Sequence, residues 1–300
     1  MTWSFERIEV DCTFTEGPVW DGEGVLFSDI PNNRIMRYVP ATDEVSVYLE
    51  GTGAANGLKL NADGELFGCE MNGRRVVRYD GPDSRTVVAD AYEGERLNSP
   101  NDLCFDSDGN LWFTDPLYAT DWLSDEPRTL GHESVYRCEP TGPDTWSIRR
   151  MTRDTTRPNG LLVSRDGSHC YVAQSKYDED YCHGGKRELR GYPIRTDAPL
   201  GEPQVLHNFY PHRAVDGMAS TDDGAIVACA GWPESGPGPM LYVFAPNGRV
   251  LATHPYPVGN PTNCCFAGPE LSTLYVTDTQ GRVYRAETDL RGALGPPSTG

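Results

Sequence analysis

One unit recurs six times along the 300-residue chain and constrains its fold more than any other feature. Each copy begins with a polar residue, often followed by Gly, and continues with a short apolar run, a turn usually of the Asp-Gly type and a second apolar run. A loop follows, and most copies then close on a run that ends near Tyr or Phe. Asp-Gly between short apolar runs is a strong signal for a β-hairpin. The copies begin at Glu16, Asn56, Asn101, Asn159, Asp216 and, approximately, Asn263.

The spacing of these copies predicts the architecture. Successive starts are 40, 45, 58, 57 and 47 residues apart, and a four-stranded propeller blade takes about 40–50 residues. The two long spacings leave room for loop insertions near 116–133 and 174–187. We therefore predict an all-β, six-bladed β-propeller of four-stranded antiparallel blades, with residues 1–300 as a single domain and 288–300 as a tail. The segment before Glu16 is a candidate to complete the last blade. A β-sandwich is the alternative, but it does not explain so regular a repeat.

Composition and charge exclude several classes of protein. The net charge of −18 disfavours nucleic acid and anionic membranes as partners. We find no apolar segment long enough for a membrane helix and no signal peptide at the N-terminus. None of the nine cysteines forms a CxxC pair, and several, such as Cys104, Cys170 and Cys229, lie inside apolar runs. We interpret them as reduced core thiols of a cytoplasmic protein, and we expect no zinc site built on paired Cys and His.

The six residues that begin the copies all carry side-chain oxygen. In a propeller the first strand of each blade is innermost, so these residues would form a ring at one end of the central channel. Two of them, Glu16 and Asp216, are carboxylates that would repel each other, and unpaired buried polar groups are costly. One divalent cation resolves both problems, with Ca²⁺ as the first choice and Mg²⁺, Mn²⁺ or Zn²⁺ as alternatives. The competing interpretation is that Asn-Gly and Asp-Gly are turns leading into strands, although no turn rule requires Glu at the first position.

The same geometry predicts the walls of a pocket around this ring. The loop after the second strand of each blade returns to the ring side, and the segment before each first strand also lies there. Polar and aromatic walls around a Lewis acid are typical of a small-molecule site. The predicted substrate-binding residues are Asn56, Glu70, Asn101, Asp115, Tyr118, Lys176 and His212.

At these residues the chain resembles the SMP-30/gluconolactonase/LRE-like family, also called the regucalcin family. The resemblance spans residues 12–287 and rests on segments 16–20, 99–102, 111–116, 157–160 and 216–218. It implies a six-bladed propeller, a divalent metal and, commonly, hydrolysis of sugar lactones. It also implies that Glu16, Asn159 and Asp216 hold the metal, and that Asn101 binds the metal or the substrate.

We predict a divalent-metal-dependent lactonase that acts on a small-molecule sugar lactone. Asp216 would serve as base or nucleophile, although a metal-bound carboxylate is a weak base, and Asn101 and Asn56 would orient the ring oxygens. A phosphotriesterase-like (organophosphate) hydrolase with the same oxygen cage is one alternative. A non-catalytic calcium-binding propeller, with a fully coordinated ion, is the other. The chain has neither a Gly-x-Ser-x-Gly motif nor an HExxH motif, which argues against a serine hydrolase and a zinc peptidase.

Overall fold

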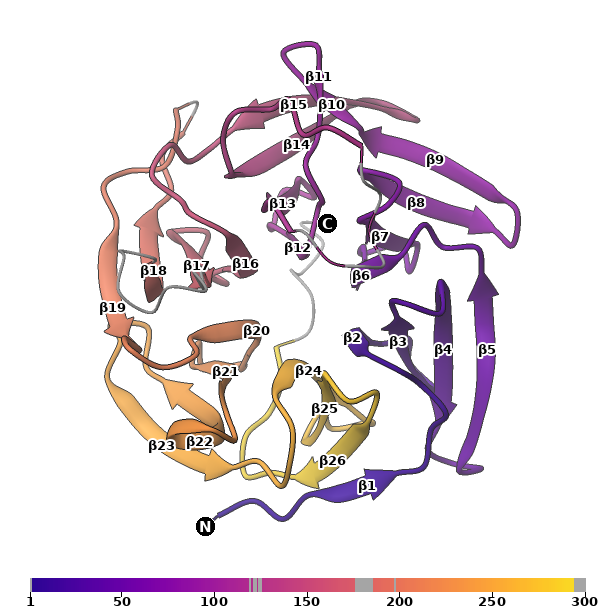
Figure 1. Cartoon of the computed structure of the whole chain (residues 1–300), viewed down its shortest axis with the longest axis vertical. Helices are drawn as coiled ribbons and strands as arrows, with labels where there is room; N and C mark the ends of the chain where they lie inside the picture. Colours follow the sequence, from indigo (N-terminus) through magenta and orange to yellow (C-terminus); the bar gives the residue numbers. More distant parts are fainter. Residues whose placement is uncertain are drawn as a thin grey trace.

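In the computed structural model, residues 2–118, 120, 123, 126–175, 186–196 and 198–293 are described. They form six four-stranded antiparallel sheets around a central axis (Figure 1). The predicted all-β six-bladed propeller is thereby confirmed. None of the described residues forms a helix that could cross a membrane.

Each of the first five blades uses four strands in chain order, from the innermost to the outermost. Blade 1 contains β2 (Thr15–Trp20), β3 (Val25–Asp29), β4 (Arg34–Val39) and β5 (Glu44–Glu50), and blade 2 contains β6 (Ala55–Leu60), β7 (Leu66–Glu70), β8 (Arg75–Gly81) and β9 (Ser84–Ala89). A small hairpin, β10 (Ala91–Tyr92) and β11 (Glu95–Arg96), leads to blade 3, which contains β12 (Leu103–Phe105), β13 (Leu111–Asp115), β14 (Ser134–Gly142) and β15 (Thr145–Arg150). Blade 4 contains β16 (Pro158–Val163), β17 (His169–Ser175), β18 (Arg187–Pro193) and β19 (Gln204–Asn208), and blade 5 contains β20 (Val215–Ser220), β21 (Ile226–Trp232), β22 (Ser235–Phe244) and β23 (Val250–Pro255).

The sixth blade joins the two ends of the chain. It contains β24 (Pro261–Ala267), β25 (Thr273–Asp278) and β26 (Val283–Glu287), and its outermost strand is β1 (Glu6–Ile8). Glu6 pairs with Arg285 in the ladder, and their side chains are 2.8 Å apart. The expectation that the segment before Glu16 completes the last blade is therefore confirmed, and the ring is closed by hydrogen bonds between distant parts of the sequence (Figure 1).

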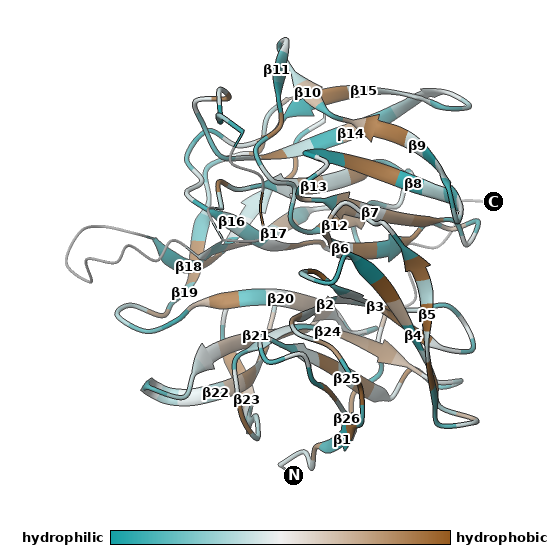
Figure 2. Cartoon of the chain, turned by 45° about the vertical axis from the view of Figure 1, so that its right-hand side comes forward, coloured by the Kyte–Doolittle hydropathy of each residue, from teal (hydrophilic) through white to brown (hydrophobic). Residues whose placement is uncertain are grey.

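The core lies between neighbouring blades. Phe67 of blade 2, for example, belongs to the same buried cluster as Phe113 and Tyr136 of blade 3. Figure 2 shows hydrophobic segments concentrated in the strands, while the connecting loops are mostly hydrophilic. The eight described cysteines are free thiols and seven of them are buried, as predicted. Each sheet therefore packs against the next one, so the apolar strand residues are buried on both faces of every sheet only when the ring is complete.

The Asp-Gly turns of the repeat form tight connections between first and second strands. In blade 3, Gly109 adopts a φ of 79°, which favours glycine, and Asp106 accepts hydrogen bonds from the backbone of Asp108 and Asn110 at 3.0 and 2.9 Å. The sequence signal for the hairpins thus has a direct structural cause.

A second set of glycines lets the backbones of neighbouring innermost strands approach each other closely at the channel. A Cβ added to Gly160 would lie 2.3 Å from the backbone oxygen of Asp216 in the next blade, and one added to Gly17 would lie 2.3 Å from that of Asn56. Gly57 donates its N–H to the carbonyl of Asn101 at 2.8 Å, which links blades 2 and 3 directly. The innermost strands therefore meet backbone to backbone around the axis.

We expect Gly160→Ala to destabilise the protein by about 1–3 kcal/mol, because the added methyl group overpacks the contact between blades 4 and 5. Gly81→Ala is the matched control, since nothing lies within 4 Å of a Cβ there and its φ is not in the left-handed region. That change should be neutral or stabilising by up to about 1 kcal/mol. Urea denaturation measures both; equal effects of the two substitutions would contradict the close-approach argument.

Candidate metal and substrate site

A one-residue bulge recurs in the innermost strand and defines the ring. In five blades the pairing between the first and second strands shifts by one residue. On the first strand the shift falls between these residues: Glu16 and Val19, Ala55 and Leu58, Pro158 and Leu161, Val215 and Met218, and Pro261 and Cys264. Blade 3 has a comparable arrangement, in which Asn101 donates to Thr114 and Thr114 donates back to Asp102. Bulges redirect side chains at the edge of a sheet. Here they place one polar residue of each blade at the channel.

The register corrects one member of the predicted ring. In blades 2, 4 and 5 the ring residue directly follows the last residue paired before the shift: Asn56 follows Ala55, Asn159 follows Pro158 and Asp216 follows Val215. In blade 6 the residue at this position, after Pro261, is Thr262. The Thr262 hydroxyl donates to the Thr15 carbonyl at 2.8 Å and lies 2.8 Å from the Thr277 hydroxyl. The prediction that Asn263 belongs to the ring was therefore wrong by one position, because this copy lacks the Gly that marks the register elsewhere.

Asn263 and Asp102 instead occupy the position that glycine holds in the other four blades. They come from β24 and from the segment just before β12, on opposite sides of the axis (Figure 1), and Asn263 opposes the rise in the pKa of Asp102 that burial causes. Asn263 opposes the rise in the pKa of Glu16 in the same way. The two residues thus lie beside the ring, and Asp102 adds a further buried carboxyl group to its surroundings.

Glu16 is buried, and Asp216, whose side chain is 13% exposed, lies close enough to influence it. Burial, followed by repulsion from Asp216 and Asp102, holds the pKa of Glu16 well above its ordinary value. Burial also raises the pKa of Asp216 to about 6, although Arg213 and Asn159 oppose the rise. In the absence of a cation the site therefore favours protons on its carboxyl groups.

Asp216 is held from two sides. Arg213 forms an ion pair with its carboxylate and also donates to the carbonyls of Gly231 and Pro261 at 3.1 and 3.0 Å. On the other side Asn159 lowers the pKa of Asp216, and its amide donates to the Tyr118 hydroxyl at 2.8 Å. The structure therefore brings Tyr118, Asn159 and Asp216 together, and their roles in binding stay a prediction.

The two remaining amides of the ring differ in their surroundings. Asn56 donates its side-chain N–H to the Met71 sulfur at 3.3 Å, a weak hydrogen bond. The backbone of Asn101 is fully used, but its side-chain amide has no hydrogen-bond partner within the described ranges, although Asn101 is only 4% exposed. A nearly buried amide in this state is suited to a ligand.

Glu70 and Asp115 lie at the ends of second strands, and both are fully buried. Glu70 forms ion pairs with Arg75 and Arg85 at 2.7 and 2.9 Å. Asp115 accepts the backbone N–H groups of Asn98 and Ser99, both at 2.9 Å, while burial raises its pKa to about 7. These contacts anchor the chain around the ring, and a substrate contact for either carboxyl group stays a prediction.

His212 and Lys176 complete the predicted set. His212 lies on the segment before β20, where its Nδ1 is 3.3 Å from the Ser235 hydroxyl. Lys176 lies outside the described residues. The sequence interpretation missed Asp102 and Arg213 as site residues. Asp102 had a detectable signal, since Asn101-Asp102 replaces the Asn-Gly or Asp-Gly of three other copies, whereas Arg213 had none.

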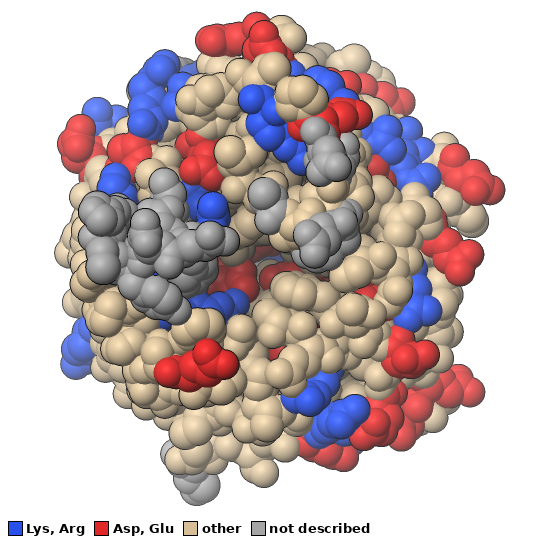
Figure 3. Space-filling view, viewed as in Figure 1, with Lys and Arg blue, Asp and Glu red and all other residues tan. Residues whose placement is uncertain are grey.

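The donor set fits a hard divalent cation. Glu16 and Asp216 supply carboxylate oxygens, Asn159 and Asn101 supply amide oxygens, and this mixture is typical of Ca²⁺. Within the described part of the chain, no group of three or more His, Cys, Asp or Glu side chains is placed to hold a metal, so amides would have to contribute. Figure 3 shows the face that carries the ring, with a hollow in its middle where acidic and basic side chains lie together.

The fold and this ring define a propeller with a polar site at one end of its channel, and comparison with known proteins identifies the family. The family described as SMP-30/Gluconolactonase/LRE-like region matches residues 14–280. The chain belongs to this family.

Individual relatives cover nearly the whole chain. A gluconolactonase of Zymomonas mobilis is 31% identical, over 96% of this chain and 82% of its own length. The diisopropyl-fluorophosphatase of Loligo vulgaris is 26% identical, over 96% and 93%. The structure of a gluconolactonase from Xanthomonas campestris superposes with a TM-score of 0.81 at 28% identity and covers 95% of this chain and 89% of its own.

The raised pKa of Asp216 predicts a pH-dependent stability of the metal-free protein. Because its folded pKa of about 6 exceeds the ordinary value of 3.8, the group contributes stability at pH values below about 4 that is lost as the pH rises through 6. We expect the melting temperature of metal-free protein, followed by circular dichroism, to fall more steeply between pH 4 and 7 in the wild type than in Asp216→Asn. Parallel pH profiles of the two proteins would contradict this assignment.

Proposed function

We propose that this protein is a divalent-metal-dependent hydrolase that opens sugar lactones. The observation that carries the proposal is that the carboxyl groups of Glu16 and Asp216 lie at one end of the channel close enough for Asp216 to repel Glu16, with the amides of Asn101 and Asn159 in the same ring. Membership of the family and 31% identity to a gluconolactonase support the reaction class.

Glu16, Asn159 and Asp216 would hold the cation, with Asn101 as a further donor. A divalent cation at this position supplies Lewis-acid polarisation of a carbonyl group. Each of these side chains comes from a different blade, so the rigid ring fixes their mutual positions. Preorganised donors of this kind stabilise developing charge without rearrangement.

The chain's own residues would bind the lactone and move the proton. The Asn101 amide is available to orient the oxygens of the lactone ring, and the Tyr118 hydroxyl next to Asn159 is placed to contact a sugar hydroxyl. Asp216, held by Arg213, would accept the proton of the attacking water. Its ion pair with Arg213 fixes the orientation of the carboxylate while it does so.

A second reaction class deserves an explicit test, because the similarity to a diisopropyl-fluorophosphatase covers nearly the whole chain. Phosphotriesters would place a P=O group where a lactone places its C=O group. A non-catalytic calcium-binding propeller is the remaining alternative.

We expect metal-stripped protein to hydrolyse glucono-, galactono- and xylono-lactones only after Ca²⁺, Mg²⁺, Mn²⁺ or Zn²⁺ is restored. Asp216→Asn should lower kcat/KM by about 10²–10⁴-fold, because it removes the proposed base, and Glu16→Gln should weaken the binding of Ca²⁺. A pH-indicator assay measures turnover, and isothermal titration calorimetry measures metal binding.

Asp63→Asn is the matched control, since this exposed carboxylate lies in an Asp-Gly turn rather than in the ring. It should leave both turnover and metal binding unchanged. Metal-loaded protein that opens no lactone but cleaves a dialkyl fluorophosphate would replace the lactonase proposal with the phosphotriesterase one. Loss of neither activity nor metal binding in Glu16→Gln and Asp216→Asn would refute the site itself.

A further inference from the structure

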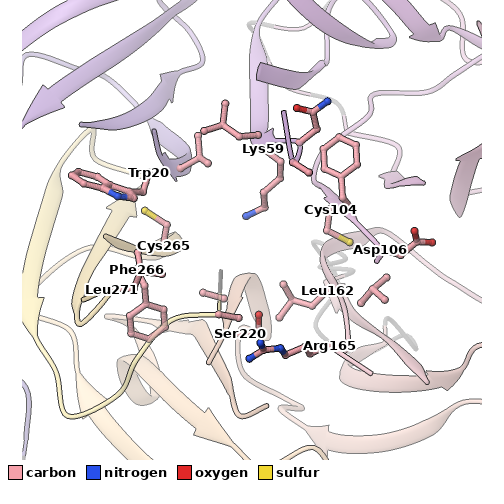
Figure 4. Close-up of a pocket in the computed structure, with 18 of the residues that line it drawn as sticks. Trp20, Lys59, Cys104, Asp106, Leu162, Arg165, Ser220, Cys265, Phe266 and Leu271 are labelled. Carbon is pink, nitrogen blue, oxygen red and sulfur yellow. The ribbon is translucent and has the colours of Figure 1, made fainter. Parts of the chain in front are cut away.

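The central channel has a second opening, at the other ends of the innermost strands. The blades follow one another anticlockwise in Figure 1 and clockwise in Figure 4, so Figure 4 looks into the end opposite to the ring. A cavity of about 560 Å³ lies there. This volume is within the range of about 300–1,000 Å³ that is typical of small-molecule sites.

The wall of this cavity follows the same repeat as the ring. The residue three positions after each ring residue lines it, and five of these six are apolar or thiol side chains. The six are Val19, Lys59, Cys104, Leu162, Ala219 and Cys265. Trp20 and Phe266 extend the apolar wall. Lys59 is thus one charged side chain in a ring of apolar ones.

Lys59 reaches from β6 into the middle of the opening (Figure 4). Its side chain forms neither a hydrogen bond nor an ion pair with any other residue in the described part of the chain. The acids of the wall are engaged elsewhere: Asp21 pairs with Arg37 at 2.7 Å, and Asp106 accepts the Trp112 indole N–H at 2.8 Å. An ammonium group held among apolar walls, with no carboxylate in hydrogen-bond contact with it, is suited to an anion.

A second cation stands at the rim. Arg165 lines the same cavity, and its guanidinium donates to the backbone carbonyl of Asp222 at 3.3 Å. Two cations gathered in one cavity contrast with the net charge of −18 of the whole chain. The local charge therefore favours a negatively charged ligand at this opening.

The cavity is separated from the ring. None of the ring residues Glu16, Asn56, Asn101, Asn159 and Asp216 lines it, and Asp102, which follows Asn101, is influenced electrostatically by Lys59. A ligand in the cavity would therefore approach Lys59 without contacting the ring, so this site does not depend on the proposed lactonase function.

We infer that this cavity binds a small organic carboxylate with an apolar body. The carboxylate lies against the Lys59 ammonium, and the apolar body lies against Trp20, Leu162 and Phe266. The ligand class is that of medium-chain aliphatic or aromatic monocarboxylic acids.

Isothermal titration calorimetry with octanoate tests this inference, with octan-1-ol and octylamine as neutral and cationic analogues. We expect 1:1 binding of octanoate that weakens roughly tenfold to a hundredfold in Lys59→Met, which keeps the apolar stem and removes the charge. Lys186→Met is the matched control, because Lys186 is half-buried and donates to the Asp154 carbonyl at 2.8 Å outside the cavity. Equal affinity for octanoate and octylamine, or an unchanged affinity in Lys59→Met, would overturn the proposal.

A second measurement uses the unmodified protein, so it does not depend on a variant that folds. The sequence contains three lysines, and acetylation by acetic anhydride can be followed at each by mass spectrometry. We expect octanoate to slow acetylation of Lys59 at least fivefold and to leave Lys186 unaffected. No protection of Lys59 at millimolar octanoate would refute the site.

Discussion

Backbone contact between neighbouring innermost strands is the constraint on which this propeller depends. Gly17 and Gly160 stand where any Cβ would collide with the carbonyl group of the next blade, and Gly57 donates its N–H to Asn101 between blades 2 and 3. The bulge beside these glycines shifts the strand register by one residue. Close packing and the polar ring are therefore one feature, because the geometry that lets the blades meet also brings one polar side chain per blade to the channel.

This packing has an electrostatic consequence. Glu16, Asp102 and Asp216 are confined to a small buried volume, and Arg213 is the partner that contacts one of them directly. Buried charges without compensation are costly, so the carboxyl groups respond by retaining protons. Asp115 shows that burial alone is not the distinction, since its pKa is raised but its oxygens are satisfied by backbone amides. The ring acids also accept hydrogen bonds, from the Gly17 N–H to Glu16 at 2.6 Å and from the Leu103 N–H to Asp102 at 2.9 Å, but Asp216 and Asp102 repel Glu16. This repulsion makes the ring, rather than the strand ends, the place for a cation.

The repeat made the fold predictable, because hairpin signals and blade lengths are local properties of sequence. The positions of Glu16, Asn56, Asn159 and Asp216 followed from it, since each copy carries the same residue types at the same register. Prediction failed where a copy departs from the pattern: without Gly after it, Thr262 could not be recognised as the ring member. The ion pair of Glu70 with Arg85 was also beyond reach, because it joins β7 to β9, which are not neighbours in the sheet.

Departures from the repeat are also where this molecule differs from a symmetrical propeller. Residues that recur in all copies contribute to the packing between blades, so they do not indicate where a binding site lies. Asp102 and Asn263 replace glycine in two opposed blades, and Asp102 lies close enough to Glu16 to raise its pKa. Lys59 replaces an apolar residue in one blade and gives the cavity at the other end a charge opposite to that of the ring acids. The same strands therefore end in an acidic ring that suits a cation and in an apolar cavity with a cation of its own, and the asymmetry between them is carried by three side chains.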